Sequence, residues 1–221
     1  MTLQRVYLIR HGQTAWNVEG RWQGFEATPL NAVGLEQARA LAAYWPTRLS
    51  AIYSSDLARA WQTAEILATA QGIRPIADER LREFNLGIFQ GLTWEEMQRR
   101  YPAEADAFRA DYMGYVVPGG ESRRQLQRRA VEAFNEIVAR NDGPEIAIVS
   151  HGGTLKVLLF HLFGETPALQ ALHMDNTAIT TLERVDHGWR LAGLAETPHL
   201  AAGVLAIGDE RQQSNEQSRP D

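Results

Sequence analysis

The sequence predicts a three-layer α/β/α sandwich whose sheet is mainly parallel with a mixed edge. The first reason is a phrase that occurs twice, an apolar run ending in histidine and glycine, at residues 6–12 and 146–152. Each run has the length and β-branched content of a buried parallel strand. Two further reasons are the alternation of short strands with helical apolar patterns, and a pair of closing strands that indicates a hairpin.

Caps and apolar spacing define the elements of the first half of the chain. In order, these are a polar loop over 13–31, a helix over 34–45, a strand over 51–54, a helix over 56–71 and an irregular segment over 80–94. Pro46 ends the first helix because proline cannot continue it. Ser54 or Ser55 is the expected N-cap of the second helix, since serine side chains accept from the free amides of a first turn.

The second half continues the alternation. Its predicted elements are helical structure over 93–113 interrupted near Pro102, a loop over 117–120, a helix over 122–140, a strand over 146–150, a helix over 154–163 and strands over 178–183 and 189–194. Ser122 and Gln125 have the spacing of a capping box. The helix over 154–163 is apolar on nearly every side and is therefore expected to be buried.

Length and composition predict one domain. The chain has 221 residues, of which 44% are hydrophobic, which suffices for one large core. We expect a single domain over residues 1–205 and a polar, flexible tail over 206–221. No run approaches the roughly 20 apolar residues of a membrane span, and the first residues lack the apolar region of a signal peptide, so a cytoplasmic location is expected.

Composition also excludes several classes of function. Without cysteine, the chain has no disulfide and no thiolate chemistry or cysteine-ligated metal. A net charge of -5 argues against a general nucleic-acid or membrane binder. Lys156 is the only lysine, so anion binding would rely on the planar, bidentate fork of arginine.

The two repeated phrases each supply a candidate catalytic histidine. His11 and His151 stand where predicted strands end, and ligands of open α/β sheets bind at the carboxyl ends of the strands. Arg10 leaves a buried strand beside His11, and a charged side chain is rarely held there without an anionic partner. Gly152 and Gly153 lead from His151 into a helix, whose free amides suit a phosphate or another oxyanion. The alternatives are a salt bridge at Arg10 and, at 151, a histidine that caps a helix or packs under a loop.

Two further residues are candidates with ordinary alternatives. Arg59 lies in the first helical turn, where a cation opposes the helix dipole unless an anion is bound nearby. A surface arginine is the alternative there. Glu83 lies among arginines in the irregular segment, where a glutamate is usually an ion-paired surface group.

Other polar residues favour no chemistry. The remaining histidines form no metal-like cluster, and only His173 is placed to line a pocket. The arginines at 123, 124, 128 and 129 are expected to form a solvated helix face.

Five blocks together carry a family resemblance. They are RHGQT with Asn17 close behind, SSDLARAWQTAEIL, RLREFNLGIFQG, PGGES and VSHGG, in this order. The chain resembles the histidine phosphatase superfamily, also called phosphoglycerate mutase-like, over about residues 5–195. The resemblance implies the phosphoglycerate mutase-like fold and hydrolysis of a small phosphorylated metabolite through a phosphohistidine.

The resemblance also implies a role for each candidate residue. His11 would attack phosphorus, and His151 would donate hydrogen bonds to the phosphoryl oxygens. Glu83 would protonate the leaving alkoxide and must therefore hold its proton near neutral pH, which the apolar cover of Phe84 and the incoming phosphate would favour. The predicted phosphate- and substrate-binding residues are Arg10, Asn17, Gln23, Gly24, Arg59, Glu83, His151 and Gly152. No metal or other cofactor is expected, because arginines and histidines supply the positive charge.

The residues distinguish less clearly between the mutase branch and the phosphatase branch of the superfamily. Mutases of this family carry a lysine three residues after the Gln-Gly that follows their acid, where this chain has Trp94, and a tyrosine where it has Leu86. Arg99 and Arg100 could substitute for this lysine, but on an amphipathic helix they have the pattern of a solvated face. An apolar lining fits a phosphatase better, and its expected residues are Phe25, Phe84, Leu86, Ile88, Phe89 and Trp94.

A phosphatase is therefore the preferred function, and PGGES also looks like the phosphatase branch, which includes broad-specificity and α-ribazole phosphatases. A cofactor-dependent phosphoglycerate mutase is the alternative, and a catalytically silent module that binds phosphorylated ligands is a third hypothesis. A small phosphorylated substrate is the expected partner, with no nucleic acid and no membrane, and a homodimer stays open.

Overall fold

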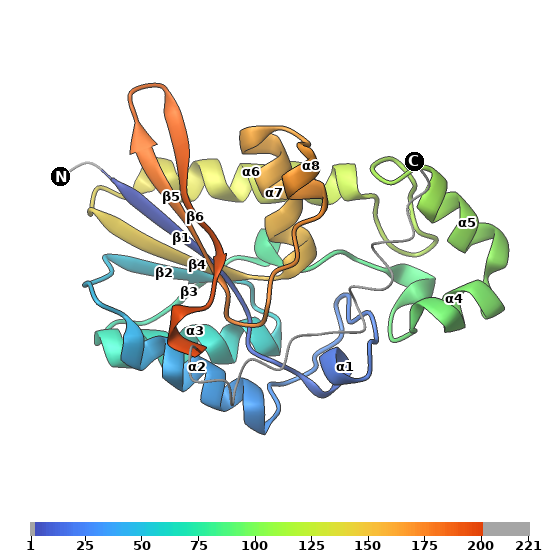
Figure 1. The fold of residues 1–221 in the computed structure, drawn as a ribbon, viewed down its shortest axis with the longest axis horizontal. Coiled ribbons are helices and arrows are strands. Elements are labelled where there is room, and N and C mark those ends of the chain that lie inside the picture. The colour runs from blue at the N-terminus through green and yellow to red at the C-terminus, as the bar shows by residue number, and fades with distance from the viewer. Residues whose placement is uncertain (1–2, 201–221) are drawn as a thin grey trace.

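The computed structural model describes residues 3–200 and contains a six-stranded sheet with helices on both faces (Figure 1). The strand order is β3-β2-β4-β1-β5-β6. The parallel strands are β1 (Arg5–Arg10), β2 (Ala51–Ser54), β3 (Ile76–Ala77) and β4 (Glu145–Ser150). Strands β5 (Ile179–Val185) and β6 (Gly188–Glu196) form an antiparallel hairpin beside β1. The predicted sandwich, its parallel centre and its mixed edge are confirmed.

Alternate side chains of the central strands enter two cores on opposite faces of the sheet. Val6 and Leu8 of β1 pack in the core that includes residues of α6 (Arg123–Arg140) and α7 (Gly152–Phe163). Ile9 packs in the core that includes residues of α2 (Ala32–Tyr44) and α3 (Ala58–Gln71). Strands buried on both faces explain why the repeated phrases read as nearly continuous apolar runs.

A third core lies in the lobe beyond one end of the sheet (Figure 1). The lobe contains α4 (Trp94–Arg100) and α5 (Pro102–Ala110), and the short 3₁₀ helices Glu79–Leu81 and Gly87–Phe89 precede them along the chain. Phe89 and Met97 are fully buried in this core. Pro102 begins α5, which confirms the predicted interruption.

Helix α7 is apolar on nearly every side, and its residues 154–160 are buried, as predicted. It begins at Gly152, two residues before the predicted start, with His151 as its N-cap. Within residues 3–200, no helix is both long and apolar enough to cross a membrane.

The structure differs from the prediction in several short elements. The predicted loop after β1 contains α1 (Ala15–Val18), because Thr14 and Asn17 form a capping box. Helix α3 begins at Ala58 with Leu57 at the N-cap position, so neither Ser54 nor Ser55 caps it. Strand β3 and helix α8 (Pro167–Gln170) were not predicted, since two to four residues carry too little periodicity. The predicted tail lies outside the described residues.

Candidate active site

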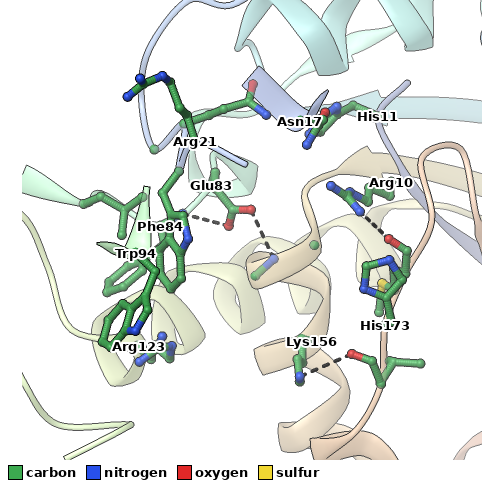
Figure 2. Close-up of a pocket in the computed structure, with 18 of the residues that line it drawn as sticks. Arg10, His11, Asn17, Arg21, Glu83, Phe84, Trp94, Arg123, Lys156 and His173 are labelled. Carbon is green, nitrogen blue, oxygen red and sulfur yellow. Dashed lines mark hydrogen bonds between the residues drawn. The ribbon is translucent and has the colours of Figure 1, made fainter. Parts of the chain in front are cut away.

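A cavity of about 240 Å³ lies between the sheet and the α4–α5 lobe (Figure 2). Eight predicted site residues line it, namely Arg10, His11, Asn17, Gln23, Gly24, Arg59, Glu83 and Gly152. His151 is buried next to them, and its ring centroid lies 5.2 Å from that of His11. The ends of β1 and β4, which are adjacent parallel strands, therefore bring the two histidines together.

His11 is held as a neutral imidazole with one defined tautomer. Its Nδ1 lies 2.7 Å from the carbonyl oxygen of Gly12. A carbonyl only accepts, so Nδ1 carries the proton and Nε2 keeps its lone pair. Burial, together with the charges of Arg59 and Arg10, holds the pKa of His11 well below its ordinary value. The side chain is thus prepared to act as a nucleophile.

Two buried arginines supply positive charge beside His11. Arg10, at the end of β1, donates from Nη1 to the carbonyl of Met174. Arg59, in the first turn of α3, donates to the carbonyls of Gly24 and Glu26, each at 2.9 Å. Burial is the main cause that lowers the pKa of Arg59 to about 10, which leaves it charged at neutral pH. Because carbonyl groups orient the Arg59 guanidinium without neutralising it, this site is suited to a phosphoryl group.

Ser55 fixes the orientation of His151. Its Oγ lies 2.8 Å from Nε2 of His151 and accepts the amide proton of Leu57 at 3.2 Å. A hydroxyl oxygen has two lone pairs and one proton, so Oγ can accept from Nε2 or donate to it, and the contact holds the ring in either tautomer. No described residue is a hydrogen-bond partner of Nδ1. Burial, with Arg59 and His11 nearby, holds the pKa of His151 well below its ordinary value.

Glu83 is held at the start of α7. The amides of Gly153 and Thr154 each donate to its carboxylate at 3.1 Å. The amide of Phe84 donates to it at 2.9 Å (Figure 2). The apolar cover expected from Phe84 is therefore combined with a polar contact from its own backbone. An added Cβ on Gly153 would lie 2.6 Å from Oε1 of Glu83, so glycine is required for this approach.

The oxyanion at these amides belongs to the chain itself. The free amides after His151 were expected to face a phosphate or another oxyanion, and those of Gly153 and Thr154 hold the Glu83 carboxylate. A helix N-terminus binds any anion, and here the chain supplies one from another segment. Gly152 still lines the cavity.

The predicted solvated face of α6 is half wrong. Arg124 and Arg128 are exposed as expected. Arg123 instead lines the cavity, with its guanidinium 3.9 Å from the centroid of the Tyr112 ring. Arg129 is partly buried and donates to the backbone carbonyls of residues 80, 82 and 83. These contacts need tertiary partners, which a helical pattern does not reveal.

Asn176 and Thr177, just before β5, are positioning residues that the sequence analysis missed. The Asn176 side chain donates to the carbonyl of His11 at 3.0 Å, and the Thr177 amide donates to the same carbonyl at 3.2 Å. Thr177 has φ of 62°, a left-handed conformation that a β-branched residue rarely adopts. The Asp-Asn-Thr sequence is a turn signal that marks this position, although it does not identify the partner.

The apolar wall differs from the expected one. Phe84, Leu86 and Trp94 line the cavity together with Trp22, Phe108 and Tyr112. Phe25, Ile88 and Phe89 were also expected there but are not among the lining residues. Ile88 and Phe89 belong to the lobe core, and Phe25 lies under the guanidinium groups of Arg82 and Arg129.

The remaining described histidines are His161, His173, His187 and His199, and one of them lines the cavity. His173 lines the cavity, as predicted, and its Nε2 lies 3.3 Å from the carboxylate of Asp175. His161 and His187 are exposed. His199 contacts the Thr177 hydroxyl at 2.8 Å, and burial lowers its pKa to about 4.

We expect the two buried histidines to make the fold acid-sensitive. Below about pH 6.5 the unfolded chain binds protons at His11 and His151, whereas the folded state keeps both side chains neutral. The free energy of unfolding is therefore highest above this pH and decreases as the pH falls. Each histidine contributes at most about 1.4 kcal/mol per pH unit. Urea unfolding at pH 7.5 and 5.5 measures how much the free energy of unfolding falls between the two pH values. This difference should be smaller in His11→Gln and in His151→Gln than in the unmodified protein. An unchanged difference in both variants would contradict the explanation.

Known proteins resemble this chain over most of its length. A family model described as histidine phosphatase superfamily (branch 1) matches residues 6–197. A metal-independent phosphoserine phosphatase of Arabidopsis thaliana is 35% identical over 208 residues, which cover 92% of this chain and 86% of that protein. A probable phosphoglycerate mutase of Yersinia enterocolitica is 34% identical over 215 residues, covering 91% and 97%. The solved structure of a mycobacterial glucosyl-3-phosphoglycerate phosphatase with VO3 matches with a TM-score of 0.77 and 35% identity, covering 87% and 98%.

Proposed function

The chain belongs to the histidine phosphatase superfamily, and from this membership we propose that its cavity hydrolyses small phosphomonoesters through a phosphohistidine on His11. One observation carries the proposal. The neutral His11, with a lone pair on Nε2, lines the same cavity as the guanidinium groups of Arg10 and Arg59 and the carboxyl group of Glu83. Nucleophile, charge stabilisers and proton donor are therefore available around one phosphoryl group.

In the first step, Arg10 and Arg59 bind the phosphoryl oxygens and His11 Nε2 attacks phosphorus. A bond from Nε2 to phosphorus forms while the bond from phosphorus to the ester oxygen breaks. Glu83 gives its proton to that oxygen, so the leaving group departs as an alcohol. His151 donates from Nδ1 to a phosphoryl oxygen and stabilises the charge in the transition state.

In the second step, water replaces the histidine. The Glu83 carboxylate takes a proton from the attacking water, and the bond between Nε2 and phosphorus breaks to release phosphate. His11 returns to its neutral form, whose Nδ1 has remained hydrogen-bonded to Gly12. All charges that stabilise phosphate come from side chains of this protein, so these steps require no metal ion.

Hydrolysis is preferred to the mutase alternative on a specific observation. Arg99 and Arg100, the residues nearest in sequence to a mutase-like basic site, are exposed on α4 and absent from the cavity lining. The phosphatase relatives named above favour the same choice. The similarity to a probable phosphoglycerate mutase keeps a mutase activity as the second candidate. In that reaction the phosphoryl group on His11 would be transferred to a sugar acid instead of to water.

The proposed function is tested with a panel of phosphorylated metabolites and p-nitrophenyl phosphate. We expect phosphate release, unchanged when the metal chelator EDTA is present. Incubation with 3-phosphoglycerate and a trace of 2,3-bisphosphoglycerate distinguishes the mutase. Rapid 2-phosphoglycerate formation with little free phosphate would reject the phosphatase. Tight phospholigand binding without any turnover would instead indicate a silent binding module.

Arg129→Met should weaken the proton donor without touching the substrate. Arg129 donates to the backbone carbonyl of Glu83 at 2.6 Å and pairs with Glu121 at 2.6 Å, so its loss releases the Glu83 backbone. We expect kcat to fall roughly 10- to 100-fold for alkyl phosphates and less for p-nitrophenyl phosphate. The free energy of unfolding should fall by about 2 kcal/mol, because the Glu121 carboxylate loses a charged partner. Arg128→Met, at an exposed position, is the matched control, and equal losses for both substrates would indicate a structural role only.

A further inference from the structure

His199 is a partly buried histidine that the proposed mechanism does not use. It lies in the 3₁₀ helix Pro198–Leu200, beyond residues 6–197, which the family model matches. Its ring packs beside Tyr44 at the end of α2, with 6.2 Å between the two ring centroids. Because burial lowers its pKa to about 4, the ring is neutral at neutral pH. A neutral imidazole can still donate one hydrogen bond, and this one contacts Thr177 just before β5.

The direction of this hydrogen bond follows from the other partner of the Thr177 hydroxyl. The hydroxyl oxygen lies 2.6 Å from the carbonyl oxygen of Asn176 and 2.8 Å from Nε2 of His199. A carbonyl only accepts, so the single hydroxyl proton points to Asn176 and the hydroxyl oxygen accepts from Nε2. Nδ1 of His199 has no hydrogen-bond partner among the described residues. Within the described part of the chain, the polar contact of the ring is therefore directed at Thr177.

Thr177 has a backbone conformation that needs support from its surroundings. Its φ of 62° lies in the left-handed region, which a β-branched residue keeps only where neighbouring contacts hold it. The residue is fully buried, and its amide donates to the carbonyls of Arg10 at 3.1 Å and His11 at 3.2 Å. His199 holds the side chain of the same residue. The hydrogen bond from His199 therefore helps to keep the Thr177 amide directed at the end of β1.

The Thr177 amide in turn supports the backbone of the nucleophile. The His11 carbonyl accepts from this amide and, at 3.0 Å, from the Asn176 side chain. These contacts fix where the His11 side chain leaves the end of β1, while the Gly12 carbonyl fixes the rotation of the ring. Displacing a reacting group by about 1 Å can cost a factor of roughly 10² in rate. Loss of support for Thr177 should therefore slow the attack of His11 on phosphorus.

Binding of the phosphoryl group has a support that is separate from Thr177. Arg59 is held by the carbonyls of Gly24 and Glu26, which belong to the loop after α1. A change at His199 leaves these contacts in place. It should therefore lower the rate of phosphoryl transfer more than the affinity for the substrate.

We propose that His199 is a positioning residue, which acts through Thr177 and holds His11 in place for attack. On the proposed function, on which this inference rests, its role is to speed the transfer of the phosphoryl group to His11. The chain after β6 thus returns to the end of β1 and supports the nucleophile from a segment that the family model does not include.

Two substitutions at His199 separate the hydrogen bond from packing. His199→Phe keeps an aromatic ring beside Tyr44 but removes the donor, whereas His199→Gln keeps an amide donor. Single-turnover rapid quench with a ³²P-labelled substrate measures the rate of phosphoenzyme formation. We expect this rate to fall roughly 10-fold in His199→Phe, with KM changed less than about twofold, and His199→Gln to recover most of it. His161→Gln, at an exposed position of α7, is the matched control and should keep the unmodified rate.

A double-mutant cycle with Thr177→Val tests whether His199 acts through Thr177. Valine keeps the β-branched shape and removes the hydroxyl, so Thr177→Val should lower the rate to a similar extent as His199→Phe. Because the two side chains are in contact, their effects should not add, and His199→Phe should cause little further loss when Thr177→Val is already present. Losses that multiply in the double variant would overturn the inference, because they would assign His199 to packing alone.

An unmodified rate of phosphoenzyme formation in either single variant, His199→Phe or Thr177→Val, would also overturn the inference. The result for Thr177→Val does not depend on whether His199→Phe folds. A His199→Gln variant as slow as His199→Phe would overturn it as well, since a donor at this position would then have no effect. Absence of a phosphoenzyme in the unmodified protein would instead reject the proposed function itself, whatever the variants do.

Discussion

Replacing His11 by alanine is expected to abolish turnover and the formation of a phosphoenzyme together. The variant keeps both guanidinium groups, so it should still bind a phosphomonoester, but it has no lone pair to attack phosphorus. The loss in kcat should reach the order of 10⁶-fold, as when the nucleophile of another covalent hydrolase is removed. A residual rate would then come from charge stabilisation and binding alone.

Rapid-quench experiments with a ³²P-labelled substrate measure this effect directly. The unmodified enzyme should show a labelled intermediate that is stable in base and labile in acid, as phosphohistidine is. His187→Ala, at an exposed hairpin position, is the matched histidine control and should retain both label and turnover. Appreciable label in His11→Ala would refute the assignment of the nucleophile.

Five of the six strands of the sheet were predictable because their signals are local, and only the two-residue β3 was missed. The parallel strands β1 and β4 are apolar on both faces, and the closing hairpin has its turn at Asp186 and His187. The same pattern placed His11 and His151 at strand ends, and the two side chains meet because β1 and β4 are adjacent parallel strands that end at the same edge. The predicted capping box at Ser122 likewise lies within four residues of sequence.

The supporting contacts of the site were not predictable in this way. Ser55 has the residue type of a helix cap, but its hydroxyl is hydrogen-bonded to the ring of His151, which is 96 residues away in the sequence. Arg129 lies on a helix face that looks solvated, yet it holds backbone carbonyls 46 to 49 residues away. Such partners depend on how the elements pack together, and no local pattern encodes that distance.

Glu83 was predictable as a candidate residue, but its contacts were not. Its identity as a candidate came from a family resemblance, because its local sequence favours an ion-paired surface group. Its geometry comes from tertiary structure, where the start of α7 holds the carboxylate through two backbone amides. In the proposed mechanism, the second histidine phrase therefore supplies a histidine for the phosphate and a helix start for the proton donor.

Replacing Glu83 by glutamine should make the enzyme selective for good leaving groups. Glutamine cannot protonate an alkoxide, so kcat/KM for alkyl phosphates should fall about 10³-fold. An aryl oxide leaves without a proton, and the loss for p-nitrophenyl phosphate should be at least tenfold smaller. The glutamine amide also cannot accept from both Gly153 and Thr154 through two oxygens, so a modest loss on every substrate is expected in addition.

The dependence on the leaving group is the decisive measurement, because it separates proton donation from orientation. A series of aryl phosphates with rising leaving-group pKa should give a steeper decline of kcat/KM in Glu83→Gln than in the unmodified enzyme. Glu95→Gln, at an exposed position of α4, should leave the slope unchanged. Parallel slopes for Glu83→Gln and the unmodified enzyme would assign Glu83 to orientation alone, and the proton would then have to come from another group in the cavity. Among the described lining residues, only His11, Glu83 and His173 have an imidazole or carboxyl side chain. His173 would therefore be the next residue to replace.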